Sequence, residues 1–294
     1  MKLLKQVLQR VSRNQCKYFC TSSIFFKKVP SNLKGRSVSS QQWLTRQLND
    51  PYVEKAKFMS YRCRSAFKLI EIDDKYKILK PGYIVVDCGA APGSWTQVIV
   101  SRTTNLLDSS ISSGCVIAID KQYIHPIEGA VILNNCDFTK KETQGKVSSI
   151  LDGNKVNDFT ETQGKVLSDM APNATGIKEL DNTNMLNLCY SVFRFAIEVS
   201  SINATFLAKL WYCNEFKAFE DNVKEFYDDV KIVKPKSSRS NSAEVVKEFY
   251  DDVKIVKPKS SRSNSAEVFI LGRYFKVLPQ CSVAVWRKYY CTKR

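Results

Sequence analysis

Residues 83–95 read YIVVDCGAAPGSW, a short apolar run that leads into a turn containing glycine. The run is rich in β-branched residues and too short for a helix, which predicts a buried strand. A helical pattern follows in SWTQVIVSRTTNLL (94–107), so the sequence predicts a strand–turn–helix unit. Gly89 and Gly93 would let the backbone turn tightly and approach a ligand. Glycines also follow strands in turns that bind nothing, so this unit alone does not establish a binding site.

Short apolar runs of strand character recur along the chain: CVIAID (115–120), AVILNNCDF (130–138), KVLSDM (165–170), ATFLAKLW (204–211), VKIVKP (230–235 or 253–258) and AEVFILGRYF (266–275). Helical patterns separate most of them, and a long one at 51–76, opened by Asp50-Pro51, precedes the first strand. This alternation predicts an α/β fold with a doubly wound, mostly parallel sheet. A KPKSSRSNS loop, whose lysine, serines and arginine suit phosphate, joins the last two strands without a helix. We therefore expect the final strand to be antiparallel.

Two segments of the chain occur twice. VKEFYDDVKIVKPKSSRSNSAEV occupies residues 223–245 and again 246–268, and DFTKKETQGKV (137–147) recurs as DFTETQGKV (158–166). Repeat folds need three or more copies, which normally diverge. Identical copies indicate a recent duplication or an error in assembling the sequence, and both explanations stay open. The letters also leave open which long copy forms the penultimate strand.

The positive charge of the chain is concentrated at its ends. The net charge is +16, yet residues 1–49 and 276–294 contain no acidic residue and the middle is nearly neutral. An RNA-binding surface in the middle must therefore be a local patch. MKLLKQVLQRVSRNQ (1–15) is basic and amphipathic, which is typical of a mitochondrial transit peptide; an RNA-binding arm is the alternative. We expect a leader at 1–40, a single domain at 41–275, a basic tail at 276–294 and a location in the mitochondrial matrix.

Several classes of protein are disfavoured by this sequence. The ten cysteines form no CxxC pair and His125 is the only histidine, so we expect no zinc site. We expect the cysteines to be buried apolar residues in a reducing compartment, and a disulfide scaffold is the alternative. No apolar run reaches 18 residues, so no membrane span is expected. A nicotinamide dehydrogenase is disfavoured because the turn at 89–93 lacks the GxGxxG spacing.

Acidic residues stand at the ends of three successive predicted strands: Asp87, Asp120 and Asp137. Ligands of such sheets bind beyond the carboxyl ends of the strands. Asp120 could accept the hydroxyls of a ribose and Asp137 the amino group of adenine. The set suits S-adenosylmethionine, whose cationic sulfonium tolerates acids that would repel a dinucleotide. Each aspartate is alternatively a helix cap or turn residue.

Four further polar residues stand where packing alone would not place them. Lys68 lies in a predicted helix, Asp169 follows the fourth strand, Lys209 interrupts the fifth and Glu267 opens the last. A lysine in a central strand is costly unless it is paired or functional. Two structural salt bridges are the alternative to a catalytic cluster.

The stretches VVDCGAAPGSW (85–95), SDMAPNATG (168–176), RCRSAFKL (62–69), FLAKLW (206–211) and SSRSNSAEV together resemble the FtsJ/RrmJ family of ribosomal RNA 2′-O-methyltransferases. The resemblance covers about residues 42–275, and WLTRQLNDPYVEKAKF (43–58) resembles the mitochondrial branch. It implies a Rossmann-like fold that uses S-adenosylmethionine and a catalytic tetrad of Lys68, Asp169, Lys209 and Glu267. The cofactor contacts that it implies are Pro92, Gly93, Ser94, Trp95, Asp120, Asp137, Phe138 and Asp169.

The implied reaction is methylation of a ribose 2′-hydroxyl, that of a uridine, in mitochondrial large-subunit ribosomal RNA by a monomer. An ordinary lysine has a pKa of about 10.4 and is protonated at neutral pH. Burial of Lys209 beside Lys68 and near the sulfonium would disfavour its charged form, so that it could serve as general base. Asp169 and Glu267 would orient the amines. The alternative is a catalytically impaired, RNA-binding ribosome-assembly factor on the same fold.

Overall fold

The computed structural model describes residues 30–31, 33–104, 114–153, 164–238 and 267–276. The chain divides into two units, Met1–Val53 and Glu54–Arg294. In the first unit, helix α2 (Val38–Leu48) is capped by Ser37, whose side chain accepts from the Ser40 amide. In the part of the chain that the structure describes, no helix is both long and apolar enough to cross a membrane.

The second unit contains a seven-stranded sheet with strand order β3-β2-β1-β4-β5-β7-β6. Its strands are β1 (Val85–Cys88), β2 (Val116–Ile119), β3 (Ala130–Leu133), β4 (Lys165–Ser168), β5 (Thr205–Trp211), β6 (Tyr227–Val233) and β7 (Glu267–Phe275). All neighbouring pairs among β1 to β5 are parallel, whereas β7 runs antiparallel to both β5 and β6. The predicted doubly wound α/β fold with an antiparallel last strand is confirmed.

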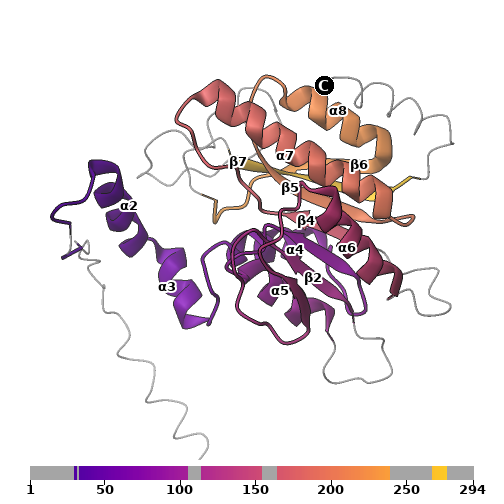
Figure 1. The fold of residues 1–294 in the computed structure, drawn as a ribbon, viewed down its shortest axis with the longest axis horizontal. Helices are drawn as coiled ribbons and strands as arrows, with labels where there is room; N and C mark the ends of the chain where they lie inside the picture. Colours follow the sequence, from indigo (N-terminus) through magenta and orange to yellow (C-terminus); the bar gives the residue numbers. More distant parts are fainter. Residues whose placement is uncertain (1–29, 32, 105–113, 154–163, 239–266, 277–294) are drawn as a thin grey trace, which may run out of the picture. The chain divides into compact units, whose positions relative to one another are not determined.

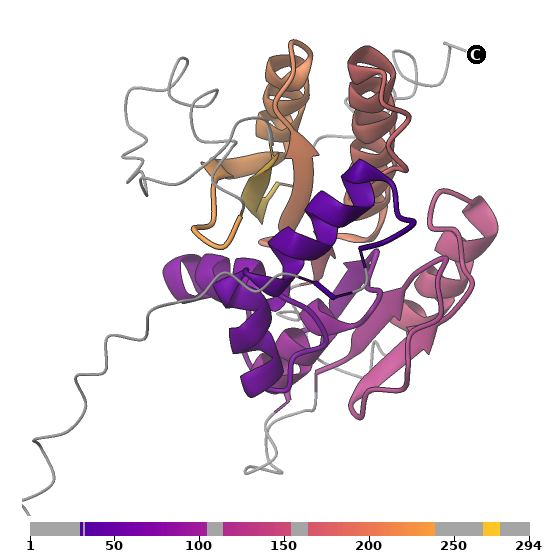
Figure 2. The same ribbon diagram turned by 90° about the vertical axis from the view of Figure 1, so that its left-hand side faces the viewer.

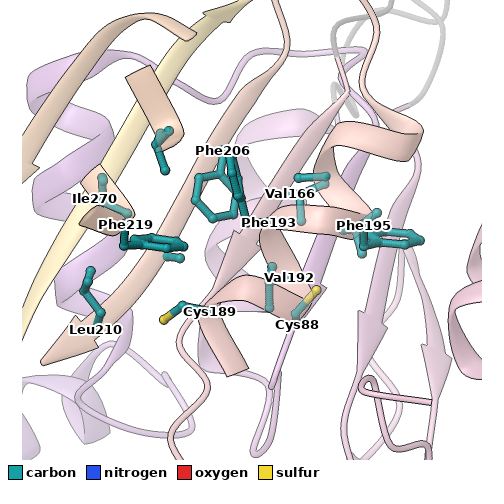
Figure 3. Close-up of a cluster of buried hydrophobic side chains, with 14 of the residues drawn as sticks. Cys88, Val166, Cys189, Val192, Phe193, Phe195, Phe206, Leu210, Phe219 and Ile270 are labelled. Atoms are coloured by element: carbon teal, nitrogen blue, oxygen red, sulfur yellow. The ribbon is translucent and has the colours of Figure 1, made fainter. Parts of the chain in front are cut away.

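Helices cover both faces of this sheet (Figures 1 and 2). One face packs against α6 (Lys141–Gly153), α7 (Lys178–Val199) and α8 (Phe216–Phe226), and the other against α4 (Ala66–Tyr76) and α5 (Ser94–Thr103). Successive residues of a strand point to opposite faces, so Phe206 enters the first core and Leu207 the second. Figure 3 shows part of the first core, in which Phe193 of α7 lies against Phe206, with ring centroids 5.3 Å apart.

The helix expected at 51–76 is in fact two helices, α3 (Pro51–Phe58) and α4, and that prediction was wrong. The chain turns between them, with Ser60 at a φ of 58°. The Arg62 amide donates to Gln97 Oε1 over 2.9 Å, which ties the turn to α5. The break brings residues 62–65 to the carboxyl edge of the sheet, where the site lies.

The run AVILNNCDF also differs from its prediction, because β3 ends at Leu133. Asn134 leaves the strand to bond with its side chain to the Ile124 amide at 2.7 Å, and Asn135 takes a φ of 55°. Asp137 therefore lies in a turn four residues beyond the strand and not at its end. Asn tolerates this left-handed backbone conformation better than most residues.

The structure assigns different strands to the two long repeats. The first copy forms β6 directly after α8, and the second copy supplies Glu267 at the start of β7. Residues 239–266, which include the rest of both copies, lie outside the described part. Most of the second DFTETQGKV segment also lies outside it; Lys165 and Val166 of that segment belong to β4.

Candidate active site

The four residues of the predicted tetrad come together at the carboxyl edge of the parallel strands. Lys68 projects from α4, Asp169 directly follows β4 and Lys209 lies in β5. Glu267 reaches the same edge because β7 runs antiparallel, which pairs its first residue with Trp211 at the end of β5. The sheet topology, and not proximity in sequence, assembles the group.

The side chains form a row of alternating charge. Lys68 Nζ lies 2.9 Å from Glu267 Oε2 and 3.6 Å from Asp169 Oδ1, and Lys209 Nζ lies 3.0 Å from the same Asp169 oxygen. Lys209 Nζ also donates to the Asp169 carbonyl oxygen over 2.6 Å. Each of the four side chains is only 10 to 16% exposed, so the pairs are weakly screened by solvent.

The charged neighbours in this row shift the pKa values of Lys68, Asp169 and Glu267. Burial alone would lower the pKa of Lys68, but Asp169 and Glu267 outweigh it and the pKa is raised. Burial would raise the pKa of Asp169, yet Lys209 and Lys68 lower it. Burial, and to a smaller extent Asp169, would raise the pKa of Glu267, but the attraction of Lys68 and Lys209 and the hydrogen bond from Lys68 together lower it. Lys68 is thus a fixed cation at neutral pH.

Ser65 is a member of the site that sequence reasoning missed. Its hydroxyl donates to Asp169 Oδ2, and its carbonyl accepts from Trp95 Nε1 over 2.9 Å. The residue sits at the start of α4, one helical turn before Lys68. It therefore fixes the Asp169 carboxylate on the side away from the two lysines. A serine in RCRSAFKL carries no sequence signal for this role, because its partner lies 104 residues away.

The loop after β6 holds Glu267 in place. Ser238 Oγ donates to Glu267 Oε1 over 2.8 Å, and Lys234 Nζ donates to the Glu267 carbonyl oxygen. Arg64 donates to the carbonyl oxygen of Ser237, which is fully buried. Burial lowers the pKa of Lys234 to about 8, with a contribution from Lys68. The serines expected to suit phosphate thus position a carboxylate, and they belong to the first repeat copy while Glu267 belongs to the second.

The turn predicted to bind the cofactor lies beside the tetrad. Gly89 and Gly93 both have positive φ, 79° and 109°. A Cβ at Gly89 would come within 2.2 Å of Met170, and one at Gly93 within 2.6 Å of Arg62. Both positions therefore require glycine for space as well as for conformation. Gly93 precedes α5, whose first amide groups point toward this edge as unpaired donors do at any helix start.

Arg62 joins this turn to the next loop of the sheet edge. Its guanidinium donates to the carbonyl oxygens of Pro92 at 2.9 Å, His125 at 2.8 Å and Pro126 at 2.9 Å. Pro92 itself is exposed. Sequence reasoning missed this clamp as well, because an arginine bound only to backbone oxygens leaves no charge pattern in the sequence.

Asp120 and Asp137, the two aspartates expected to bind the cofactor, have different hydrogen-bond and ion-pair partners. Asp120 accepts from the amides of Ala91 at 2.9 Å and Gln122 at 2.7 Å, one on each oxygen. Asp137 accepts from the amide and hydroxyl of Thr139 and pairs with Lys121 at 3.0 Å. Burial would raise the pKa of Asp137, but these partners lower it. Asp137 is therefore ionised at neutral pH.

Three of the expected cofactor contacts have side chains that are packed inside the protein. Trp95 is 2% exposed and stacks on Phe269 at 5.8 Å, and Phe138 is 3% exposed and meets Phe195 edge-on at 5.2 Å. Ser94 is buried with its hydroxyl 2.9 Å from Cys63 Sγ. These residues can touch a ligand at this edge only through their backbone groups.

Asp87 provides an independent observation that a polar ligand fits here. It is fully buried at the end of β1; Oδ2 accepts from Thr96 at 2.7 Å, whereas Oδ1 has no hydrogen-bond partner among the described residues. Burial, with Asp169 and Asp120 nearby, raises its pKa to about 7. Buried carboxylate oxygens normally have a partner. A ligand that is cationic and can donate hydrogen bonds, such as S-adenosylmethionine, would suit the carboxylates of Asp87, Asp120 and Asp169. Among the described residues, no three His, Cys, Asp or Glu side chains form a metal site.

Comparison with known proteins gives a consistent result. The family model for FtsJ-like methyltransferases matches residues 61–246. The chain is 52% identical over 221 residues to "rRNA methyltransferase 2, mitochondrial" of Drosophila melanogaster, covering 75% of this chain and 86% of that one. It is 43% identical over 213 residues to "Ribosomal RNA large subunit methyltransferase E" of Parvibaculum lavamentivorans, covering 71% and 80%. A crystal structure of a provisionally assigned ribosomal RNA methyltransferase from Plasmodium falciparum matches with a TM-score of 0.55 at 26% identity, covering 73% of this chain and 98% of that one.

Proposed function

The chain belongs to the FtsJ-like methyltransferase family, and we propose that it methylates the 2′-hydroxyl of a uridine ribose in mitochondrial large-subunit ribosomal RNA. The observation that carries this proposal is the buried row Glu267–Lys68–Asp169–Lys209 beside the glycine turn of β1. Two structural salt bridges would need neither a shared carboxylate nor an orphaned Asp87 oxygen at the same edge.

The relatives support the choice of substrate and compartment. One is described as a mitochondrial rRNA methyltransferase and the other as acting on the large ribosomal subunit. The basic, amphipathic segment 1–15, which lies outside the described residues, agrees with import into mitochondria. We further propose that the protein acts as a monomer in the matrix and that the leader at 1–40 is removed.

Lys209 is the residue best placed to take the proton of the 2′-hydroxyl. Lys68 touches two carboxylates and its pKa is raised, so it keeps its own proton at neutral pH. Lys209 Nζ pairs with Asp169 alone among the described carboxylates, and it shares the Oδ1 atom of that carboxylate with the cationic Lys68. A second cation bound near Asp169 would favour release of a proton from Lys209. A neutral Lys209 Nζ can then accept a proton while the ribose oxygen forms its new bond.

The other three residues would hold this amine and the ribose in position. Asp169 orients Lys209 through both its carboxylate and its carbonyl oxygen. Glu267 anchors Lys68, whose remaining N–H groups could donate to the 2′-oxygen as negative charge develops there. Because the lysines and acids share contacts, they would titrate as a coupled group.

S-adenosylmethionine, when bound, would supply the electrophilic methyl group on its cationic sulfonium. The chain would hold it with Asp120 and Asp137, with the backbone of 92–95 and 138, and with Asp169 beside the tetrad. Gly93 permits the close backbone approach, and the α5 amides offer donors. Asp87, ionised by a bound cation, would then find a partner for its free oxygen.

The proposal is tested by incubating the purified chain with methyl-labelled S-adenosylmethionine and a transcript of mitochondrial large-subunit RNA. After digestion to nucleosides, we expect the label in 2′-O-methyluridine. Label in a base methyl group would contradict the ribose assignment. If both ligands bind and no label transfers, the enzyme proposal fails and the assembly-factor alternative is favoured.

A further inference from the structure

A cavity of about 140 Å³ lies at the edge of the sheet opposite the tetrad. It is lined where β4 and β5 begin, at Lys165 and Thr205, and where β7 ends, at Arg273 and Tyr274. Lys165 and Asp169 are four residues apart along one extended segment, so the two sites are separated by roughly 13 Å through the sheet. No residue of the cavity belongs to the proposed active site.

The lining of this cavity is cationic. Lys77, Lys80, Lys165 and Arg273 all contribute to it, and none of the described residues that line it is acidic. Asp229 does pair with Arg273, from the neighbouring strand β6, through Nε at 2.8 Å. Lys165 is 3% exposed, and burial, followed by repulsion from Lys80, lowers its pKa to about 7. The fold thus places the Lys165 amine at a cavity whose described charged lining residues are all cationic.

Aromatic rings alternate with these cations. Lys165 Nζ lies 4.5 Å from the ring centroid of Tyr83. The Arg273 guanidinium carbon lies 5.7 Å from the Tyr76 ring centroid and 5.4 Å from that of Tyr274. Tyr274 is 48% exposed, so its ring is available to a ligand. Cations interleaved with exposed aromatic rings are typical of surfaces that bind single-stranded nucleic acid, since bases stack and phosphates pair.

The backbone around the cavity is also unusual. Lys77, Asn203 and Tyr274 have φ values of 53°, 64° and 60°, and all three line the cavity. Lys77 ends helix α4 and Asn tolerates this conformation, so two of these have ordinary explanations. Tyr274 lies within a strand, where a positive φ for an aromatic residue is strained. Such strain is concentrated at ligand sites.

From this geometry we propose that the cavity binds a phosphate-bearing nucleotide, with the phosphate against Lys77, Lys80 and Lys165 and the base on a tyrosine ring. This nucleotide is either part of an RNA strand or a free nucleoside monophosphate. The site does not depend on the methyl transfer proposed above. It would place a second contact for RNA on the face of the domain that the tetrad does not reach, and it is a local basic patch in the otherwise nearly neutral middle of the chain.

The test is photo-crosslinking in the absence of S-adenosylmethionine. The full chain is irradiated with a single-stranded RNA decamer that contains 4-thiouridine, and separately with 4-thiouridine monophosphate, and the adducts are mapped by mass spectrometry. Mapping is necessary because the basic, acid-free ends of the chain would also attract RNA electrostatically. The variant is K77Q/K80Q, which changes two exposed lysines, and the matched control is K146Q/K217Q, which changes two exposed lysines on α6 and α8.

We expect adducts on the peptides that contain Tyr83 or Tyr274, reduced about tenfold in K77Q/K80Q and within about twofold of wild type in the control. Labelling by the decamer alone would identify an RNA strand as the ligand, and labelling by the monophosphate as well would identify a free nucleotide site; both results support the chemistry. Adducts confined to the tetrad edge and the chain ends, or equal labelling in K77Q/K80Q, would overturn the proposal.

Discussion

Replacement of Glu267 by Gln, compared with the same change at Glu244, tests which repeat copy supplies the acid of the tetrad. Each of the two residues lies in an identical SSRSNSAEV stretch, and the sequences differ only after the valine, with VKEFYDD following Val245 and FILGRYF following Val268. The structure places Glu267 against Lys68, whereas Glu244 lies outside the described residues. E244Q is therefore the matched control for E267Q, because the SSRSNSAEV stretch that contains each glutamate is the same.

The expected effect follows from the contacts of Lys68. Removing one partner of a buried ion pair costs about 3–5 kcal/mol when the remaining charge is left alone. Here Asp169 stays 3.6 Å from Lys68 Nζ, and a glutamine can still accept from Lys68 with its Oε1 while its Nε2 donates to the Ser238 hydroxyl. We therefore expect the transition state to lose about 2 kcal/mol of stabilisation, which corresponds to a turnover about thirtyfold slower. E244Q should lie within about twofold of wild type.

The assay is single-turnover methyl transfer at saturating S-adenosylmethionine, with thermal unfolding and cofactor affinity measured on the same preparations. An unchanged cofactor affinity in E267Q would separate loss of the tetrad from loss of the fold. The reasoning is refuted if E244Q is impaired as much as E267Q, or if E267Q turns over at the wild-type rate.

Three further predictions concern the surroundings of the tetrad. S65A removes the hydroxyl that donates to Asp169, so it should slow turnover about tenfold without changing the cofactor affinity. S65T, which keeps a hydroxyl, should restore the rate. An unchanged rate in S65A would contradict the positioning role of Ser65. Burial raises the pKa of Asp87 to about 7, so between about pH 4 and 7 the native chain holds a proton that the unfolded chain releases. The free energy of unfolding should therefore fall as pH rises through this range, by at most about 4 kcal/mol. In denaturant titrations, D87N should lack this part of the pH dependence. Deletion of residues 239–261 joins Ser238 to a single intact copy of the loop and should preserve turnover while raising stability by about 1.5 kcal/mol through the shorter loop; lost activity with intact folding would show that the insert contributes to the site.

The sequence was sufficient for the fold because the strands are short, apolar and regularly separated by helices. The grouping of Lys68, Asp169, Lys209 and Glu267 was implied by the family resemblance and not by the strand pattern, and the structure brings the four side chains together. The break at 59–65 was missed because the apolar pattern continues across it, whereas the structure shows the turn in the positive φ of Ser60 and in the contact of the Arg62 amide with Gln97. Family membership helped with the roles, which remain predictions.

What could not be read from the sequence depends on contacts between distant segments. Ser65 and Ser238 are unremarkable serines until the fold brings them to Asp169 and Glu267. Trp95 and Phe138 were expected at the cofactor, but a side chain that packs into the core looks the same in sequence as one that faces a ligand. Identical repeat copies carry no information about which one forms β6; the direct connection from α8 decides it.

The most direct test of the account is turnover by K209R. Arginine keeps the positive charge beside Asp169, so a structural salt bridge would survive the change, but a guanidinium cannot act as a base at neutral pH. The account predicts that K209R, like K209A, binds S-adenosylmethionine about as tightly as wild type and transfers no measurable methyl group to RNA. Near-normal methyl transfer by K209R would contradict the assignment of Lys209 as the base.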